Sequence, residues 1–189
     1  SSQKKHDVLI LGDCEVYENI STVTMWENYG ISSYIRGSAE QLIWQSYYIL
    51  EDTLKYEKPE VVILNVLAMS ESEAKSEAYN RMTIDGMKWS SSKLASIKES
   101  MTDKENMASY VFPLLRYHSR WSELSKEDMK YMFKQPKITT NGYLMQTGVR
   151  PVTTIPKAAP LADYSFSDRN FEYLDKMYSL CKENDIKLV

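Results

Sequence analysis

Three consecutive residues near the start of the chain, Gly12, Asp13 and Cys14, could do chemistry together. They follow the apolar run VLIL at residues 8–11, which is typical of a strand buried on both faces. In an open parallel sheet, ligands bind at the carboxyl ends of the strands. There a glycine permits a tight turn, a thiol is a nucleophile, and neighbouring backbone N–H groups can stabilise an oxyanion. The segment therefore predicts a site for acyl transfer, with Cys14 as the nucleophile and Asp13 beside it.

The same segment fits two other kinds of strand-end site less well. A phosphate-binding loop needs several glycines, and GDCEVYEN at residues 12–19 contains one. An acidic site of the receiver or dehalogenase type needs paired aspartates, and only Asp13 is present. A structural thiol stays open as the alternative, because a buried cysteine is usually inert.

Gly37 ends a second strand candidate, ISSYIRG at 31–37, and Asn65 comes near the end of a third, EVVILNVL at 60–67. From the residues alone, these are a turn glycine at 37 and an asparagine that satisfies loop backbone groups at 65.

A polar and aromatic cluster, His118, Arg120 and Trp121, occurs in RYHSRWSEL at residues 116–124. We expect these residues to contact substrate, and His118 to serve as a base if it lies over Cys14. A histidine that only positions the surrounding chain is the alternative. His6, the other histidine, precedes the first strand and is expected at the opposite end of the sheet.

Arg81, in YNRMTIDGMKW at residues 79–89, is a further candidate for substrate binding. Arginine forms bidentate pairs with carboxylates and phosphates, so Arg81 or Arg120 is suited to an anionic group of the substrate. Internal pairing with Asp85 or Glu123 is the alternative.

The strand candidates at 8–11, 31–37 and 60–67 alternate with helical patterns, which predicts an α/β fold with a parallel sheet. Ser21 and Gly30 mark the two ends of a short helix. A second helix is expected within residues 38–59, with Ser38 as its N-cap.

Residues from about 68 to 165 lack this rhythm and are interpreted as an insertion into a single domain that spans 1–189. Helices are expected within 90–100 and 125–134, and the Asn-Gly pair in TTNGYLM predicts a turn. The proline-rich stretch 149–166 predicts an extended segment or an edge strand.

A last helix is expected after Ser167, followed by a strand from residue 186. Its expected apolar face is Phe171, Leu174, Met177, Tyr178 and Cys181. Because the chain stops within that strand, we expect the C-terminal part of the fold to be missing.

Composition excludes several classes of partner. A net charge of -3 with scattered Lys and Arg gives no electrostatic footprint for nucleic acid. No apolar stretch is long enough to span a membrane, although the polar start SSQKK is also compatible with removal of an N-terminal anchor. Two cysteines, Cys14 and Cys181, are too few for a disulfide scaffold and lack metal-ligand spacing, so no cofactor is expected.

DVLILGDC, followed by a helix and by Gly37 on the next strand, resembles the SGNH (GDSL-type) hydrolase family, whose first block reads Gly-Asp-Ser. The longer phrases EAYNRMTIDGMKWS, YVFPLLRYHSRWSEL and PLADYSF are similar to SGNH-like proteins of Gram-positive bacteria. The resemblance implies a flavodoxin-like, three-layer α/β/α fold. It implies that the Gly37 N–H and the Asn65 side-chain amide join the Cys14 N–H in an oxyanion hole. It also implies an ester hydrolase or O-acyltransferase that acts on ester-linked acyl groups, such as those of cell-envelope carbohydrate, outside the cell or in its envelope; a cytoplasmic location is the alternative.

The chain departs from the family pattern at three places. Cys14 stands where the family has serine, Asn65 lacks the flanking residues of Gly-x-Asn-Asp, and no Asp-x-x-His follows Asp163. The resemblance therefore implies that the general base comes from sequence beyond Val189. Two other functions therefore stay open. One is a non-catalytic module that binds a glycan or a partner, and the other is a flavodoxin-like protein that binds a small phosphate compound.

Overall fold

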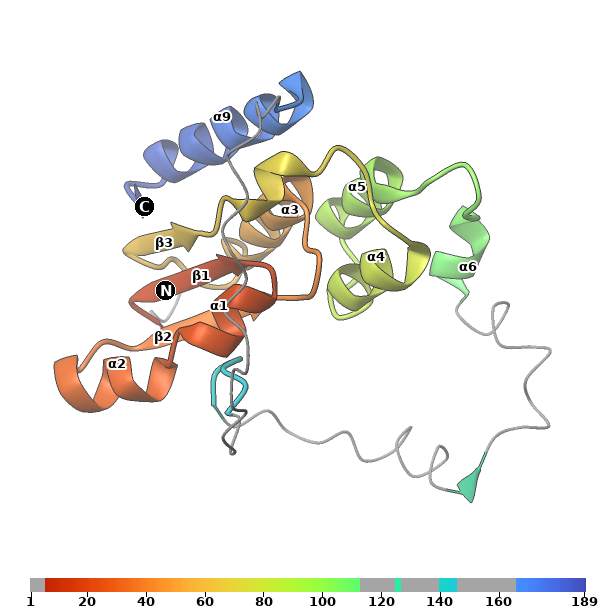
Figure 1. Ribbon diagram of the computed structural model, residues 1–189. Coiled ribbons are helices and arrows are strands. Elements are labelled where there is room, and N and C mark those ends of the chain that lie inside the picture. The colour runs from red at the N-terminus through yellow and green to blue at the C-terminus, as the bar shows by residue number, and fades with distance from the viewer. Residues whose placement is uncertain (1–5, 113–124, 127–139, 146–165) are drawn as a thin grey trace, which may run out of the picture.

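A computed structural model describes residues 6–112, 125–126, 140–145 and 166–189 (Figure 1). Its centre is a four-stranded, all-parallel sheet in the order β2-β1-β3-β4, which confirms the α/β class. The strands are β1 (Val8–Gly12), β2 (Ser33–Gly37), β3 (Val61–Leu64) and β4 (Lys187–Leu188). This order is that of doubly wound sheets of the flavodoxin-like type.

Helices surround the sheet and extend beyond one side of it (Figure 1). They are α1 (Cys14–Asn19), α2 (Thr22–Tyr29), α3 (Ile43–Thr53), the 3-10 helix η1 (Leu67–Ser70), α4 (Glu77–Ile84), α5 (Ser91–Ser100), α6 (Met107–Val111) and α9 (Asp168–Glu183). α5 packs against α3, and α4 and α6 pack against α5. None of the described helices is long and apolar enough to cross a membrane.

Side chains of β1 alternate between the two faces of the sheet, so both faces are covered. Val8 and Ile10 pack with Val16 of α1 and with the partly buried Met25 of α2. Leu9 and Leu11 point to the opposite face, toward α3 and α9. A strand buried on both sides requires a continuous apolar run, which is what residues 8–11 provide.

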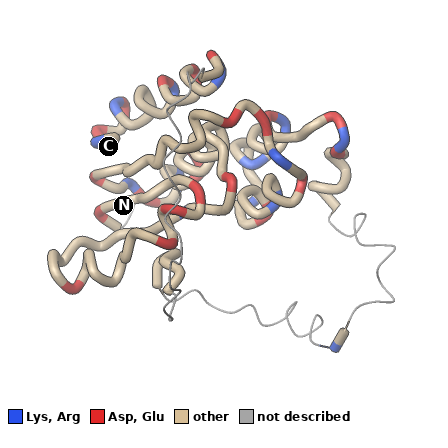
Figure 2. Tube along the Cα trace, in the orientation of Figure 1, with Lys and Arg blue, Asp and Glu red and all other residues tan. Residues whose placement is uncertain are grey.

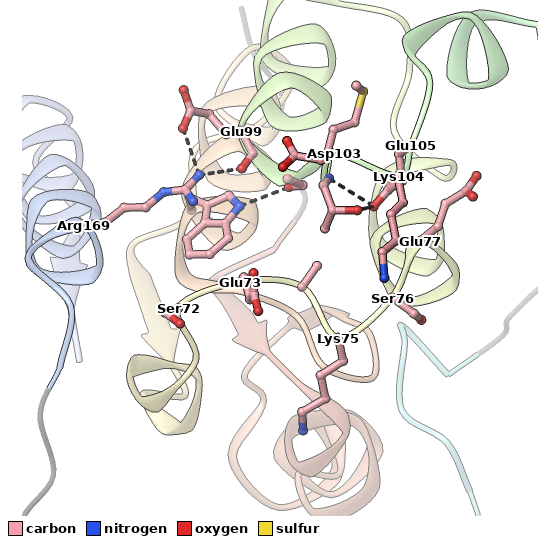
Figure 3. A pocket seen from close by; sticks show the side chains of 15 residues that line it. Ser72, Glu73, Lys75, Ser76, Glu77, Glu99, Asp103, Lys104, Glu105 and Arg169 are labelled. Atoms are coloured by element: carbon pink, nitrogen blue, oxygen red, sulfur yellow. Dashed lines mark hydrogen bonds and ion pairs between the residues drawn. The ribbon is translucent and has the colours of Figure 1, made fainter.

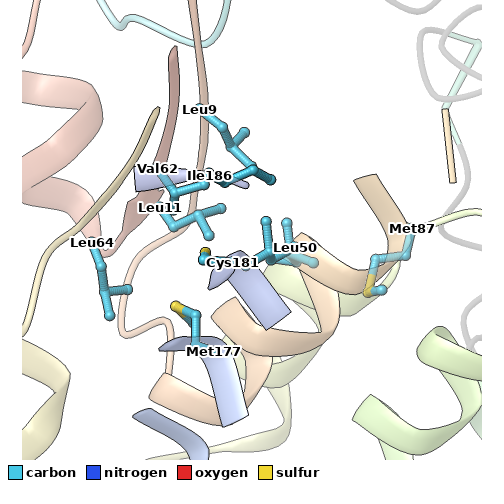
Figure 4. Close-up of a cluster of buried hydrophobic side chains, with 10 residues drawn as sticks. Leu9, Leu11, Leu50, Val62, Leu64, Met87, Met177, Cys181 and Ile186 are labelled. Carbon is cyan, nitrogen blue, oxygen red and sulfur yellow. The ribbon is translucent and has the colours of Figure 1, made fainter. Parts of the chain in front are cut away.

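The larger core lies between the sheet and the helices α3 and α9 (Figure 4). Leu50 of α3 meets Met177 and Cys181 of α9 under the strand residues Leu11 and Val62. Cys181 is 1% exposed, and burial raises the pKa of its thiol to about 11. This second cysteine is therefore a core residue.

Several predicted helix ends are confirmed. The Ser21 hydroxyl caps α2 by accepting a hydrogen bond from the Thr24 N–H at 3.1 Å, and Gly30 ends that helix at a φ of 66°. The predicted helix within 90–100 is α5, with Ser90 as its N-cap.

Ser38 is not the N-cap of the second long helix, so that prediction is wrong. α3 begins after Leu42, because Glu40 has a φ of 58° and no helix passes through that conformation. The Ser38 hydroxyl instead bonds to Thr83 on α4 and to the Gln41 side chain.

The last helix begins where it was predicted, but it buries a partly different face. Ser167 caps α9, and Met177 and Cys181 are buried as expected. Phe171 and Tyr178, however, are 48% and 57% exposed. In their place α9 buries Asn170 and Tyr173, polar residues described with their partners below.

The predicted Asn-Gly turn is present, with φ values of 47° at Asn141 and 89° at Gly142. It lies against the outer edge of β2, where the Ile35 N–H donates to the Asn141 carbonyl at 2.9 Å. Residues 127–134 of the predicted helix at 125–134, and residues 149–165 of the proline-rich stretch, lie outside the described residues. The insertion at 68–165 stays a prediction; its described part contains the end of η1 and the helices α4, α5 and α6.

Candidate functional site at the strand ends

The carboxyl ends of β1, β2 and β3 bring Gly12, Gly37 and Asn65 together. Gly12 stands opposite Gly37 in the parallel register of β1 and β2. Asn65 directly follows β3, and its backbone N–H donates to the Leu11 carbonyl at 2.9 Å. A Cβ added to Gly12 would lie 2.6 Å from the Cβ of Asn65. All three candidates from the sequence therefore share one edge of the sheet.

Gly37 is required by close packing at this edge. A Cβ at this position would lie 2.6 Å from Cγ2 of Val16. Along β2 the Ile35 N–H points to the outer edge, whereas the Ser38 N–H points inward to the Gly12 carbonyl at 3.3 Å. By the alternation of a parallel ladder, the Gly37 N–H faces outward like that of Ile35. An oxyanion hole that uses this amide would therefore open toward the outer edge of β2.

Cys14 is the first residue of α1 and is partly exposed. The Asp13 carboxylate caps α1 by accepting the Glu15 N–H at 2.9 Å. Burial, followed by the charges of Asp13 and Glu18 and a smaller contribution from Glu40, raises the pKa of the Cys14 thiol. Among the described residues, no cation is a cause of this shift, so the thiol is protonated near neutral pH.

The Asn65 side chain is already engaged. Its Nδ2 donates to Oε2 of Glu15 at 3.2 Å, and its Oδ1 accepts the Leu67 N–H at 2.7 Å. The loop-capping role expected as the alternative is therefore present. The amide can hold an oxyanion only if its bond to Glu15 is exchanged for one to the ligand.

Arg81 is held by internal partners on α4 and α6. It is 6% exposed, and its guanidinium bonds to Glu77 at 2.7 Å and to Ser109 at 2.9 Å. It also approaches Asp85 at 3.4 Å and stacks on the ring of Tyr110 at 4.2 Å. This is the internal pairing that the sequence left open, and it occupies the donors that a substrate would need.

His118, Arg120 and Trp121 lie outside the described residues. His6 lies at the amino end of the sheet, as expected, where Nδ1 is 2.9 Å from Oε2 of Glu57 and the ring stacks on Tyr34. No histidine among the described residues therefore lies at the strand ends with Cys14.

Two of the pockets in the described part of the protein lie among the helices and at the end of β2, respectively. The larger, of about 810 Å³, lies between α9 and the loops around α4 and α5 (Figure 3). Arg169 stacks on the Trp44 ring at 3.7 Å and binds Glu99, and none of the residues lining this pocket is a cysteine or histidine. The second pocket, of about 530 Å³, follows the outer edge of β2 and includes Gly37.

The sequence did not indicate Tyr17 or Thr83, which line the pocket at the β2 edge. Tyr17 stands three residues after Cys14 on α1, and helical spacing places the two on one side of that helix. This spacing was the one signal in the sequence that could have identified Tyr17.

No family model, curated protein or solved structure matches the chain.

Charge also limits what the site can bind. Figure 2 shows Lys and Arg interspersed with Asp and Glu along the described chain, without a basic stripe. The charged groups that act on the thiol in the described part of the chain include Asp13, Glu18 and Glu40. The described residues contain no group of three or more acidic, His or Cys side chains arranged for a metal ion. The arrangement thus suits a neutral ligand and acid-base or nucleophilic chemistry.

Proposed function

We propose that the protein is an SGNH-type hydrolase or acyltransferase that acts on ester-linked acyl groups, such as those of cell-envelope carbohydrate, with Cys14 as its nucleophile. The observation that carries the proposal is the meeting of Gly12, Gly37 and Asn65 at one edge of a parallel sheet, with a partly exposed thiol at the start of α1. Ligands bind at this edge in doubly wound sheets.

In the proposed reaction, Sγ of Cys14 attacks the carbonyl carbon of the ester. A C–S bond forms, the C–O bond to the alcohol breaks, and the thiol proton passes through a general base to the leaving alkoxide. Water or a second alcohol then attacks the thioester. This releases an acid or a new ester and returns the proton to sulfur.

The reaction requires a general base, because the raised pKa of Cys14 leaves little thiolate near neutral pH. His118 is the candidate base from the sequence, and His6 is the control because it lies at the other end of the sheet. His118→Ala should abolish ester turnover, and His6→Ala should leave it unchanged.

The proposal is tested by hydrolysis of p-nitrophenyl esters and by mass spectrometry after treatment with a β-lactone, which acylates active-site nucleophiles. Turnover and an adduct on Cys14 are expected for the wild-type protein, and both should be lost in Cys14→Ala. Cys181→Ala is the matched control, because that thiol lies in the core and should not affect turnover. Absence of both turnover and adduct in the wild-type protein would refute the enzymatic function.

A non-catalytic module that binds a glycan or partner is the second candidate. It is favoured by the raised pKa of Cys14 and by the engagement of the Asn65 amide with Glu15. Such a module should bind an O-acetylated glycan equally well before and after Cys14→Ala, with no ester cleavage in either protein. Cleavage that depends on Cys14 would exclude it.

A further inference from the structure

The pocket along the outer edge of β2, here called the β2-edge pocket, has the size of a small-molecule site. Its volume is about 530 Å³, within the range of roughly 300–1,000 Å³ that is usual for such sites. Residues of α1, of β2 and the loop after it, of α4 and of the Asn-Gly turn line it, among them Tyr17, Gly37, Ser38, Met82 and Tyr143.

Four polar side chains of the pocket wall, those of Arg36, Ser38, Gln41 and Thr83, already have hydrogen-bond partners within the protein. The Ser38 hydroxyl bonds to Thr83 and, at 3.3 Å, to Gln41. The Gln41 amide donates to the Arg36 carbonyl at 3.2 Å, and the Arg36 guanidinium donates to Thr53 at 2.9 Å. A sugar ring in this pocket would leave several hydroxyls without partners, which is costly, whereas an apolar group would not. The pocket therefore favours an apolar ligand.

Cys14 does not line the pocket itself, but a wall residue is its neighbour on α1. Tyr17, in the pocket wall, stands at the i+3 position from Cys14 on α1, where side chains are neighbours. Consistent with this proximity, Cys14 is among the groups that raise the pKa of Tyr17, after burial. The outward-facing N–H of Gly37 lies in the same wall.

We propose that the β2-edge pocket holds the acyl group of the ester, and that this group is an uncharged apolar chain longer than acetyl. The inference rests on the proposed function and adds the substrate class to it. With the chain in the pocket, the ester carbonyl would lie between Sγ of Cys14 and the Gly37 N–H. The carboxylates of Asp13, Glu18 and Glu40 around the thiol disfavour an acyl group that carries a negative charge.

Turnover of p-nitrophenyl acetate, butyrate and hexanoate measures the preference for chain length. Burial of each additional methylene should raise kcat/KM by about fourfold until the pocket is full. Gly86→Leu tests the pocket, because Gly86 lines it and an added Cβ there meets nothing within 4 Å. This variant should lose most of the preference for hexanoate over acetate. Ser91→Leu, at an exposed position outside the pocket, should keep it.

A second measurement does not depend on turnover. Hexanamide, a neutral amide with the same acyl chain, should slow the alkylation of Cys14 by iodoacetamide in the wild-type protein and in Ser91→Leu. It should give no protection in Gly86→Leu, and glucose should protect none of the three proteins.

The two measurements separate the pocket from the proposed function. Protection by hexanamide with neither ester turnover nor a β-lactone adduct on Cys14 would support an apolar-ligand pocket and refute the enzyme. Turnover without a preference for chain length, or protection that survives Gly86→Leu, would overturn the pocket and leave the enzyme standing. Protection by glucose instead of hexanamide would also overturn it, in favour of a carbohydrate ligand.

Discussion

Replacing Gly37 by alanine tests how closely α1 packs over the ends of β1 and β2. The new Cβ would lie 2.6 Å from Cγ2 of Val16 and 2.9 Å from the Gly12 carbonyl oxygen. Val16 is 2% exposed, so its methyl group has no solvent to move into. Overpacking costs about 1–3 kcal/mol, and the lower entropy of the unfolded alanine chain offsets about 0.4–1 kcal/mol of that. We expect the free energy of unfolding to fall by about 1–2 kcal/mol, which lowers Tm by roughly 2–8 °C.

Urea unfolding followed by circular dichroism measures this change, with Gly86→Ala as the matched control. A Cβ at Gly86 meets nothing within 4 Å, so that variant should gain about 0.4–1 kcal/mol. Gly37→Ala should cost less in a Val16→Ala background, because the clashing methyl group is gone. If Gly37→Ala is as stable as the wild-type protein, or costs the same in both backgrounds, the packing of α1 over β2 described above is wrong.

Three further variants test the site and its support. Burial, and then the charge of Asp13, raise the pKa of Cys14. Alkylation of Cys14 by iodoacetamide near neutral pH should therefore be slower than alkylation of a cysteine in an unstructured peptide. Asp13→Asn should lower that pKa and speed the labelling, and equal rates would contradict the electrostatic cause. Arg81→Met removes buried hydrogen bonds to a charged group and should cost about 2 kcal/mol in urea unfolding; a neutral result would show that Arg81 does not support the fold. Ser167→Ala removes the cap of α9 and should lower the free energy of unfolding by about 1 kcal/mol, which a fall in Tm reports. Ser179→Ala, on the exposed side of that helix, should leave Tm unchanged.

The central strands could be predicted because they are buried on both faces, which demands an apolar run whatever the rest of the chain does. The caps of α2 and α9 could be predicted for a similar reason, since Ser21 and Ser167 satisfy backbone groups within their own helix turn. Gly12, Gly37 and Asn65 meet because parallel strands end at one edge. All of these features depend on local sequence and on a general rule of parallel sheets.

The features that could not be predicted from the sequence depend on partners that are distant in the chain. Ser38 looks like an N-cap, but its hydroxyl bonds to Thr83, 45 residues later. Asn170 is buried because its amide donates to the carbonyls of Met69 and Glu71, both at 2.8 Å. Tyr173 is buried with its hydroxyl 3.0 Å from that of Tyr48.

The helix α4 could not be predicted for the same reason, because its buried positions include polar residues. Asn80 is fully buried, with its Oδ1 accepting from Gln45 at 2.8 Å and its Nδ2 donating to the Ser100 carbonyl at 2.8 Å. The spacing of apolar residues cannot identify such positions, because a polar side chain is buried only where the fold supplies its hydrogen-bond partners.

The carboxylates around position 14 affect a cysteine thiol at this position differently from a serine hydroxyl. Besides burial, Asp13, Glu18 and Glu40 raise the pKa of Cys14, because carboxylates repel the thiolate. A serine hydroxyl stays neutral until it attacks, so the same carboxylates do not impose that penalty on its resting state. A site that transfers acyl groups should therefore keep or gain ester turnover in Cys14→Ser and lose it in Cys14→Ala. A site that only binds should show no ester turnover in either variant and the same ligand affinity in both. Turnover in Cys14→Ser but not in Cys14→Ala would therefore decide for the enzyme.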